Sequence, residues 1–293
     1  MLKVIAGLSV IFLIQSGPSL RPDPPIACDM CAEWNKEREP FRVFGNTYYV
    51  GVEGLSVALI TSDQGHILLD GGLPQSAALI DKNIRKLGFR TEDIRLIVSS
   101  HTHFDHVGGI AALQRFSGAR VAASAAGAKA LEEGMPNSDD PQYAEHKAYP
   151  SVSKVRVVRD GETLHVATQK ITAHFTPGHT PGGTTWTWRS CEGSRCLNMV
   201  YADSLNAVSS AGFRFTGDKT HPSIVETFRR SIATVEQLPC DILIPVHPGF
   251  SSLFKNLERR NQGNSEALVD PHACRTYAGN ARQTLERRIS EER

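Results

Sequence analysis

The sequence predicts an α+β fold in which β-sheets pack together as a sandwich and helices cover the outside. Each half of the 293-residue chain begins with short strand-like segments and continues with helical ones. The composition, 40% hydrophobic and 22% charged, is that of an ordinary globular protein able to bury a sizeable core. Residues 41–293 therefore form one predicted domain, preceded by an N-terminal extension at 20–40.

Residues 1–19 are predicted to be a signal peptide. Lys3 precedes an apolar run at 4–14, which has the length of a signal-peptide core and is shorter than the ~20 residues of a membrane-spanning helix. The alternative, a short core helix, is disfavoured by the Pro-rich segment 21–25 that follows. We therefore expect export to the periplasm, with the signal peptide cleaved and no stable membrane anchor.

The charges of the chain are nearly balanced. Thirty-two Lys and Arg residues stand against 31 Asp and Glu residues. Without an overall basic field, binding to nucleic acid or to an anionic membrane surface is not expected. A small molecule is the expected substrate.

The first half of the domain is predicted to open with an antiparallel meander. Its strands are short runs separated by Gly, Asn and Asp turns, at residues 41–43, 47–52, 56–61 and 65–69. Apolar side chains at helical spacing then predict a helix at 76–87, which Gly88 ends. Next come a strand at 94–98, a helix at 108–116, a strand at 119–124 and a segment at 134–151, whose Pro, Asn, Asp and Tyr content predicts a mobile surface loop.

The second half repeats this plan of strands followed by helices. Strands are predicted at residues 154–158, 162–166, 171–175, 184–189 and 199–203. A helix near 222–238 and a buried strand at 241–246 follow, and from Gln262 onward the pattern mixes loop with a helix that ends near Arg288.

Six cysteines in an exported chain predict three disulfides. Cys191 and Cys196 flank a short polar insert, so they are expected to staple the tip of a hairpin. Cys240 and Cys274 could tie the strand at 241–246 to the C-terminal region. Cys28 and Cys31 remain as a Cys-x-x-Cys pair in the N-terminal tail, where a structural staple is favoured over free or mispaired thiols.

Four residues of metal-ligand type lie directly after the buried strand at 94–98: His101, His103, Asp105 and His106. His101 and His103 are two positions apart, so in an extended segment they leave the same face. A turn then brings Asp105 and His106 to a neighbouring position, with two glycines following. Desolvating three imidazoles and a carboxylate together is costly without a cation, so this cluster predicts a metal site.

The segment His-Thr-His-Phe-Asp-His at 101–106 resembles the signature of the metallo-β-lactamase superfamily. Three further motifs carry the same resemblance: Leu-Leu-Asp-Gly-Gly at 68–72, Thr-Pro-Gly-His-Thr-Pro-Gly at 176–182, and Pro-Val-His-Pro-Gly at 245–249. The resemblance implies a four-layer αβ/βα sandwich with the metal ligands on loops at one edge of the sheets. It also implies two Zn²⁺ ions per chain.

Carried over by position, the resemblance implies His101, His103 and His179 as ligands of one zinc, and Asp105, His106 and His247 as ligands of the other. Each site would remain open to a bridging hydroxide, which attacks a carbonyl carbon while zinc polarises its oxygen. In this mechanism Asp105 and the three histidines of the first site are the catalytic residues. Asp70 would orient a ligand, either His101 or Asp105, the alternative being a turn carboxylate at a strand end.

The segment 201–206, the Leu-Pro-Cys-Asp stretch at 238–241 and the Cys240/Cys274 spacing resemble the subclass B3 β-lactamases. This implies a monomeric periplasmic enzyme that hydrolyses the lactam amide of penicillins, cephalosporins and carbapenems. Ser204 and Asn206 would then bind the substrate carboxylate, their alternative being plain polar residues at a strand end. The competing functions are an exported lactonase or thioesterase, and a protein that retains metal without turnover.

Other polar residues carry less specific predictions. Asp203 is placed outside the metal ligands. Gln142 and Tyr143 are candidate contacts to the substrate, with a role as solvated loop residues left equally open. The remaining histidines lack ligand spacing and are expected in surface or core roles; they are His66, His146, His165, His174, His221 and His272.

Overall fold

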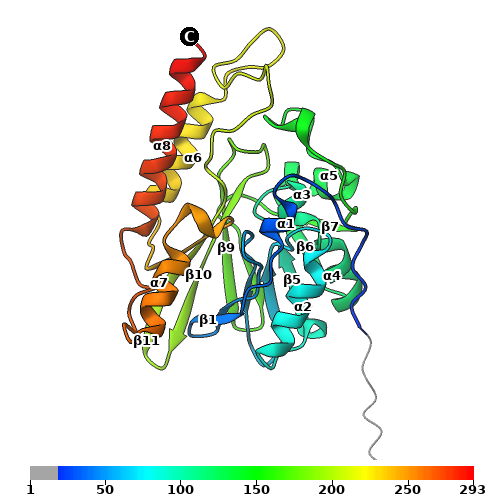
Figure 1. Ribbon diagram of the computed structural model, residues 1–293, viewed down its shortest axis with the longest axis vertical. Coiled ribbons are helices and arrows are strands. Elements are labelled where there is room, and N and C mark those ends of the chain that lie inside the picture. Colours follow the sequence, from blue (N-terminus) through cyan, green and yellow to red (C-terminus); the bar gives the residue numbers. More distant parts are fainter. Residues whose placement is uncertain (1–18) are drawn as a thin grey trace, which may run out of the picture.

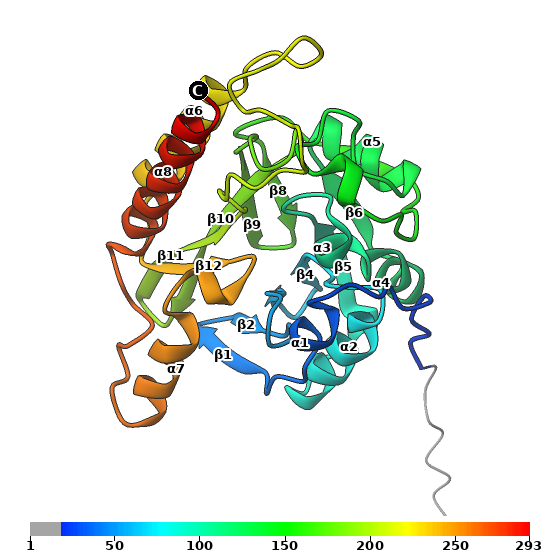
Figure 2. The same ribbon diagram turned by 45° about the horizontal axis from the view of Figure 1, so that its top comes forward.

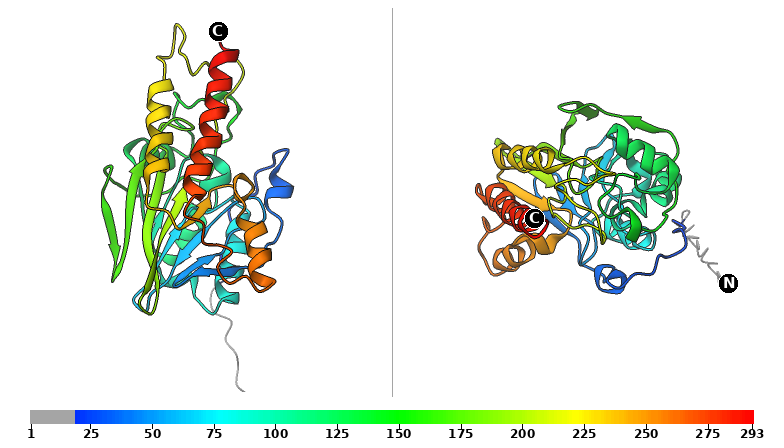
Figure 3. Two further views of the ribbon diagram at one scale, coloured as in Figure 1. Left: turned by 90° about the vertical axis from the view of Figure 1, so that its left-hand side faces the viewer. Right: turned by 90° about the horizontal axis from the view of Figure 1, so that it is seen from above.

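Two β-sheets pack against each other between layers of helices in the computed structural model, which describes residues 19–293 (Figure 1). The predicted signal peptide, apart from Ser19, lies outside these residues. Seen from above, the helices between the strands of the first sheet lie on one side of the molecule, and the late helices lie on the other (Figure 3). The predicted αβ/βα sandwich is confirmed.

The first sheet contains seven strands in chain order. They are β1 (Phe41–Phe44), β2 (Thr47–Tyr49), β3 (Ala58–Ile60), β4 (His66–Leu69), β5 (Ile94–Val98), β6 (Arg120–Ala123) and β7 (Val155–Val157). The pairs from β1 to β4 are antiparallel, whereas those from β4 to β7 are parallel. Parallel neighbours need crossovers, and helices supply them: α2 (Ser76–Lys86), α3 (Phe104–Val107), α4 (Ile110–Ser117) and α5 (Ala125–Glu133).

The second sheet has five strands in the order β12-β11-β10-β9-β8. They are β8 (Thr163–Val166), β9 (Gln169–Phe175), β10 (Thr184–Glu192), β11 (Arg195–Ala202) and β12 (Ile242–Pro245). Only β12 pairs in parallel within this sheet, and the helix that precedes it is α6 (Val225–Gln237). The chain ends with α7 (Leu253–Asn261) and α8 (Ala273–Glu291), and α8 lies beside α6 (Figure 2), where Arg229 and Glu286 form an ion pair of 2.7 Å.

Three apolar clusters match these layers: one lies between the first sheet and its helices, one between the two sheets, and one between the second sheet and helices α6 and α8. Leu68 packs with the helices over the first sheet, whereas its neighbour Leu69 packs between the two sheets. This is the alternation expected of a strand buried on both faces. Trp186 of β10 is fully buried between the sheets, and its indole nitrogen donates to the Ser99 carbonyl at 2.9 Å, which ties the second sheet to the end of β5.

The structure contains helices that the sequence pattern did not predict. The longest of them are α5 and α7, and a single turn, α1, spans Cys31–Trp34. Helix α5 carries end signals: the Ser124 hydroxyl accepts from the Gly127 N–H, and Gly134 ends the helix in the left-handed conformation. Its many alanines leave little contrast between polar and apolar positions, so its periodicity is weak.

The segment 134–151 is a connecting segment, as predicted, but it is only partly a surface loop. Asn137, Asp140 and Tyr149 are buried, and Tyr143–Glu145 forms a short 3-10 turn. The backbone of Tyr149 pairs with that of Gly134, so the segment folds back on its own start. It is therefore held against the body of the protein.

All three predicted disulfides are present: Cys28–Cys31, Cys191–Cys196 and Cys240–Cys274. Cys191 and Cys196 lie opposite each other in the β10–β11 hairpin. Cys240, just before β12, is joined to Cys274 in the first turn of α8. Within residues 19–293, the structure has no helix with both the length and the apolar character needed to cross a membrane.

Replacing both Cys240 and Cys274 by serine is expected to lower the free energy of unfolding by about 3 kcal/mol, because the bridge restricts a long loop of the unfolded chain. The Cys191–Cys196 bridge closes a much shorter loop, so replacing these two cysteines by serine should lower the free energy of unfolding by less. Urea denaturation followed by circular dichroism measures both. An equal loss in the two double variants would contradict this explanation.

Candidate active site

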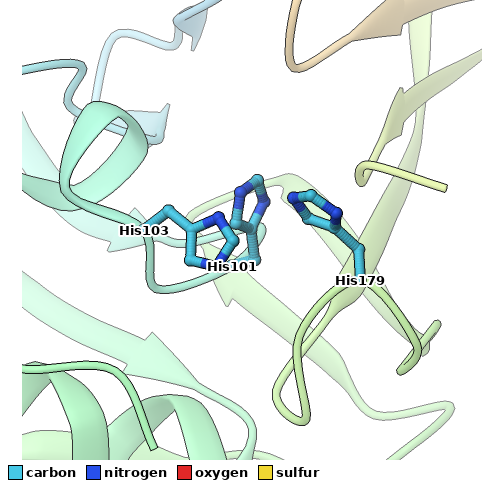
Figure 4. Close-up of side chains that lie close together, drawn as sticks. All are labelled: His101, His103 and His179. Carbon is cyan, nitrogen blue, oxygen red and sulfur yellow. The ribbon is translucent and has the colours of Figure 1, made fainter. Parts of the chain in front are cut away.

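The six predicted ligands come together in two groups of three at one edge of the sheets. The ligand atoms of His101, His103 and His179 lie within 4.8 Å of one another, and so do those of Asp105, His106 and His247. In Figure 4, His179 from the β9–β10 connection faces His101 and His103 from the segment after β5. The other group combines two residues of α3 with one that follows β12.

The turn after β4 packs beside the ligand segment and is locally strained. Asp70, at the end of β4, adopts a φ of 64°, a left-handed conformation that is uncommon outside glycine. Its carboxylate accepts 2.7 Å hydrogen bonds from both the backbone N–H and the hydroxyl of Ser100, and a 2.9 Å bond from the Tyr201 hydroxyl. These bonds hold the conformation in place.

Asp70 makes no hydrogen bond to a ligand side chain in residues 19–293; it acts on the ligand segment through Ser100. Its nearest ligand ring is His106, whose Nδ1 lies 3.8 Å from the carboxylate, rather than His101 or Asp105. It reaches the first group only through Ser100, the residue before His101. Nearby, the Gly71 N–H donates to the His106 carbonyl at 2.8 Å, and a Cβ on Gly109 would overlap the Gly71 carbonyl, so glycine is required there.

One ring nitrogen of each of four histidines is held by an oxygen from outside the two groups. These pairs are His101 Nδ1 with Asp203 (2.8 Å), His179 Nδ1 with the Asn206 carbonyl (2.9 Å), His247 Nδ1 with the Gly54 carbonyl (3.0 Å), and His103 Nε2 with Asp140 (3.1 Å). A ring whose outer N–H donates to such an oxygen turns its other nitrogen inward as a lone pair. Metal-binding histidines are commonly oriented in this way.

The inward-facing atoms fit a metal ion. Within the described residues, His101 Nε2 is buried without a hydrogen-bond partner, which is unfavourable unless a cation accepts its lone pair. In the second group, the Nε2 atoms of His106 and His247 lie 3.1 Å apart and within 3.4 Å of Asp105 Oδ2. Three donor atoms that converge so closely have the arrangement of a metal site.

Burial also keeps most of these rings uncharged. It lowers the pKa of His103 and of His179 to about 3, and that of His247 to about 4. For Asp105, burial alone would raise the pKa, but His106 and His247 outweigh it and hold the pKa well below its ordinary value. Neutral imidazole and ionised carboxylate are the forms that bind a metal, so the first group is prepared for one near neutral pH. His106 differs: burial lowers its pKa, but Asp105 and Asp70 outweigh burial and raise it, so metal binding in the second group would displace a proton.

Asp203, which the sequence placed outside the ligands, is fully buried behind His101. Burial raises the pKa of its carboxyl far above the ordinary value. The backbone approaches it closely, since a Cβ on Gly183 would overlap its Oδ2. Asp203 is thus a positioning residue for His101.

Two residues beside His103 were missed by the sequence reasoning. Asp140, from the segment 134–151, bonds the outer nitrogen of His103 from 37 positions away and is buried. The ring of His146 stacks on that of His103, with 3.6 Å between the centroids. The expectation of a plain surface or core role for His146 is therefore wrong, and no spacing in the sequence could have indicated either contact. These three residues form a third close group, in which Asp140 contacts the edge of the His103 ring at Nε2 and His146 covers its face.

A cavity of about 650 Å³ opens over the ligand groups. Ser204, Asn206 and Gln142 line it, as the sequence suggested, whereas Tyr143 is exposed and is not among the lining residues. The predicted N-terminal extension contributes Trp34, whose ring lies 5.3 Å from that of His247. Apolar side chains complete the wall: Phe104, Val208, Phe250 and Phe254.

Changing Asp140 to asparagine should weaken metal binding at the first group about tenfold or more, because the negatively charged acceptor beside His103 Nε2 is replaced by a neutral amide, which binds the N–H more weakly and can also present its NH2 group to the ring. Competition with a chromophoric chelator measures this affinity. Asp139→Asn is the matched control, since the neighbouring carboxylate is exposed. If the two variants bound metal equally well, Asp140 would have no positioning role.

The chain is similar to known proteins over most of its length. A family model described as the metallo-beta-lactamase superfamily matches residues 50–191. The Rm3 metallo-beta-lactamase is 54% identical with a TM-score of 0.89, and the match covers 91% of this chain and 99% of that one. MEM-A1, a subclass B3 metallo-beta-lactamase from a soil metagenome library, is 49% identical with a TM-score of 0.86, over 88% and 98% of the two chains.

Curated relatives are more distant. An N-acyl homoserine lactonase from Bacillus sp. is 26% identical over 147 residues, which is 42% of this chain. The match spans about half of that relative, 54% of its length. A hydroxyacylglutathione hydrolase from Maricaulis maris is 33% identical over 89 residues, or 30% of this chain and 27% of that protein.

Proposed function

The chain belongs to the metallo-β-lactamase superfamily, and from this membership we propose that it is a zinc-dependent β-lactamase of subclass B3. The observation that carries the proposal is the pair of three-ligand groups under one cavity. A purely structural zinc site is usually closed by four protein ligands, whereas a catalytic one keeps a position free. The high identity to β-lactamases over nearly their whole length favours the lactam amide as the bond that is cleaved.

We propose two zinc ions per chain, one held by each group of three ligands. Bound zinc would lower the pKa of water and polarise the lactam carbonyl. The protein supplies the orientation for this chemistry: Asp203 and Asp140 hold the rings of His101 and His103, and backbone carbonyls hold His179 and His247.

The cavity lining provides the contacts for the rest of the substrate. The polar side chains of Ser204 and Asn206 would bind the substrate carboxylate. Gln142 lines the same cavity, and its side-chain nitrogen, which is buried without a hydrogen-bond partner in residues 19–293, would donate to a substrate carbonyl after the amide turns towards the cavity. On the apolar wall, Trp34 and Phe250 would cover hydrophobic substituents and exclude water.

We further propose that the enzyme acts in the periplasm as a monomer, after loss of residues 1–19. The three disulfides support an oxidising compartment. β-Lactams pass through the periplasm before they reach cell-wall enzymes, so a hydrolase located there would meet them first.

Removing zinc should abolish hydrolysis of nitrocefin, and adding it back should restore full activity at two equivalents per chain. Chelation followed by titration with zinc tests this, and native mass spectrometry counts the bound ions. An acyl-homoserine lactone and a glutathione thioester serve as comparison substrates. A zinc-loaded protein inert to penicillins, cephalosporins and carbapenems, or faster on the lactone, would refute the proposal.

Replacing Ser204 or Asn206 by alanine should raise KM for β-lactams about tenfold and leave kcat nearly unchanged, because a hydrogen bond to a charged group is lost. Zinc affinity should stay the same in Asn206→Ala, since the group that holds His179 is the backbone carbonyl of Asn206, which the substitution keeps. Steady-state kinetics and chelator competition separate the two effects. Unchanged KM in both variants would rule out carboxylate binding here.

A further inference from the structure

The acidic side chains at the rim of the cavity have no basic counterpart in its lining. The described lining residues include Glu53 and Glu145 but no Lys or Arg. Glu53 is compensated nonetheless, because Arg38 lies 3.0 Å from its carboxylate. Of these two rim carboxylates, Glu145 is the one without a basic partner in residues 19–293.

Glu145 is presented by a turn that is firmly anchored. The Asp140 carboxylate accepts from the Gln142 N–H at 2.8 Å, and the Glu145 N–H donates to the Gln142 carbonyl at 3.0 Å. On the other side of Glu145, the His146 ring stacks on His103. The backbone of Glu145 is therefore held between two residues that line the cavity, and its side chain is exposed there.

No ion pair neutralises Glu145 in the part of the chain that the structure describes. Lys147 is close in sequence, but its ammonium group donates to the carbonyl of Ala27 in the N-terminal extension. An uncompensated carboxylate on an anchored turn at the mouth of a cavity attracts cations and repels anions during binding.

We propose that Glu145 is a specificity-determining residue that favours β-lactams carrying a positively charged substituent. The inference rests on the proposed β-lactamase function and deepens it. The substrate carboxylate is bound near Ser204 and Asn206, and a cationic substituent elsewhere on the molecule approaches Glu145. Aromatic side chains in the lining, such as Trp34, can also attract a cation to the face of the ring by a cation–π interaction.

The test compares matched substrates that differ in charge. One pair is benzylpenicillin and its α-amino derivative. The other is two cephalosporins with the same thienylacetyl side chain, one bearing a pyridinium and the other an acetoxy group at the 3-methylene. In Glu145→Gln, kcat/KM for the cationic member of at least one pair should fall about threefold, which is the size expected for the loss of one exposed charge. The kcat/KM of the member without the cationic substituent should equal that of the wild type within experimental error.

Three further measurements sharpen the result. Glu145→Lys should reverse the preference, with a fall of about tenfold for the cationic member. The wild-type preference should shrink in about 1 M salt, where surface charges are screened. Glu133→Gln is the matched control: it removes the same charge from an exposed residue outside the cavity lining and should change nothing.

The outcomes distinguish the two proposals. If none of the four compounds is hydrolysed by the zinc-loaded wild type, the β-lactamase function fails. If all are hydrolysed and Glu145→Gln leaves the ratio of kcat/KM in both pairs as in the wild type, Glu145 has no role in specificity and the inference is overturned.

Discussion

The structure depends on keeping several imidazole rings buried, uncharged and turned with one nitrogen inward. Burial alone lowers the pKa of these rings, but it does not set their direction. Direction comes from oxygens behind them, of which the Asp203 carboxylate at 2.8 Å from His101 is the most deeply buried example. Burial makes the charged form of this carboxyl group costly, and a neighbouring metal-bound imidazole would offset that cost.

That requirement explains why two sheets are needed. His101 and His103 follow a strand of the first sheet, whereas His179 and His247 follow strands of the second. The sheets must therefore be fixed at this edge, and Tyr201 of β11 does so by donating to Asp70 at the end of β4, at 2.9 Å. Through Asp70, the same bond supports the strained turn that precedes the ligands.

Much of this could be predicted from the sequence, because both sheets and the ligand segment have strong local patterns. The alternation of strands and helices indicated the sandwich, and the spacing of His101 to His106 indicated the metal site before any contact was known. What could not be predicted are contacts between distant segments with no pattern of their own. Asp140 lies in an irregular segment, so its bond to His103 depends on tertiary packing alone. Helix α5 was missed because its alanines give a weak periodicity.

The anchoring of the segment 134–151 has an evolutionary consequence. This segment carries Asp140, which holds a ligand ring, and also Gln142 and Glu145, which line the cavity. Surface segments are normally free to change length and composition as substrates change. Here an insertion or deletion that reshapes the cavity also shifts the support of His103. Because linked binding equilibria are reciprocal, a substrate that displaces the segment also weakens metal binding at the first group. Weaker metal binding in turn makes the segment easier to displace. Point changes that keep the length of this segment are therefore the ones that can alter the cavity and leave the support of His103 intact.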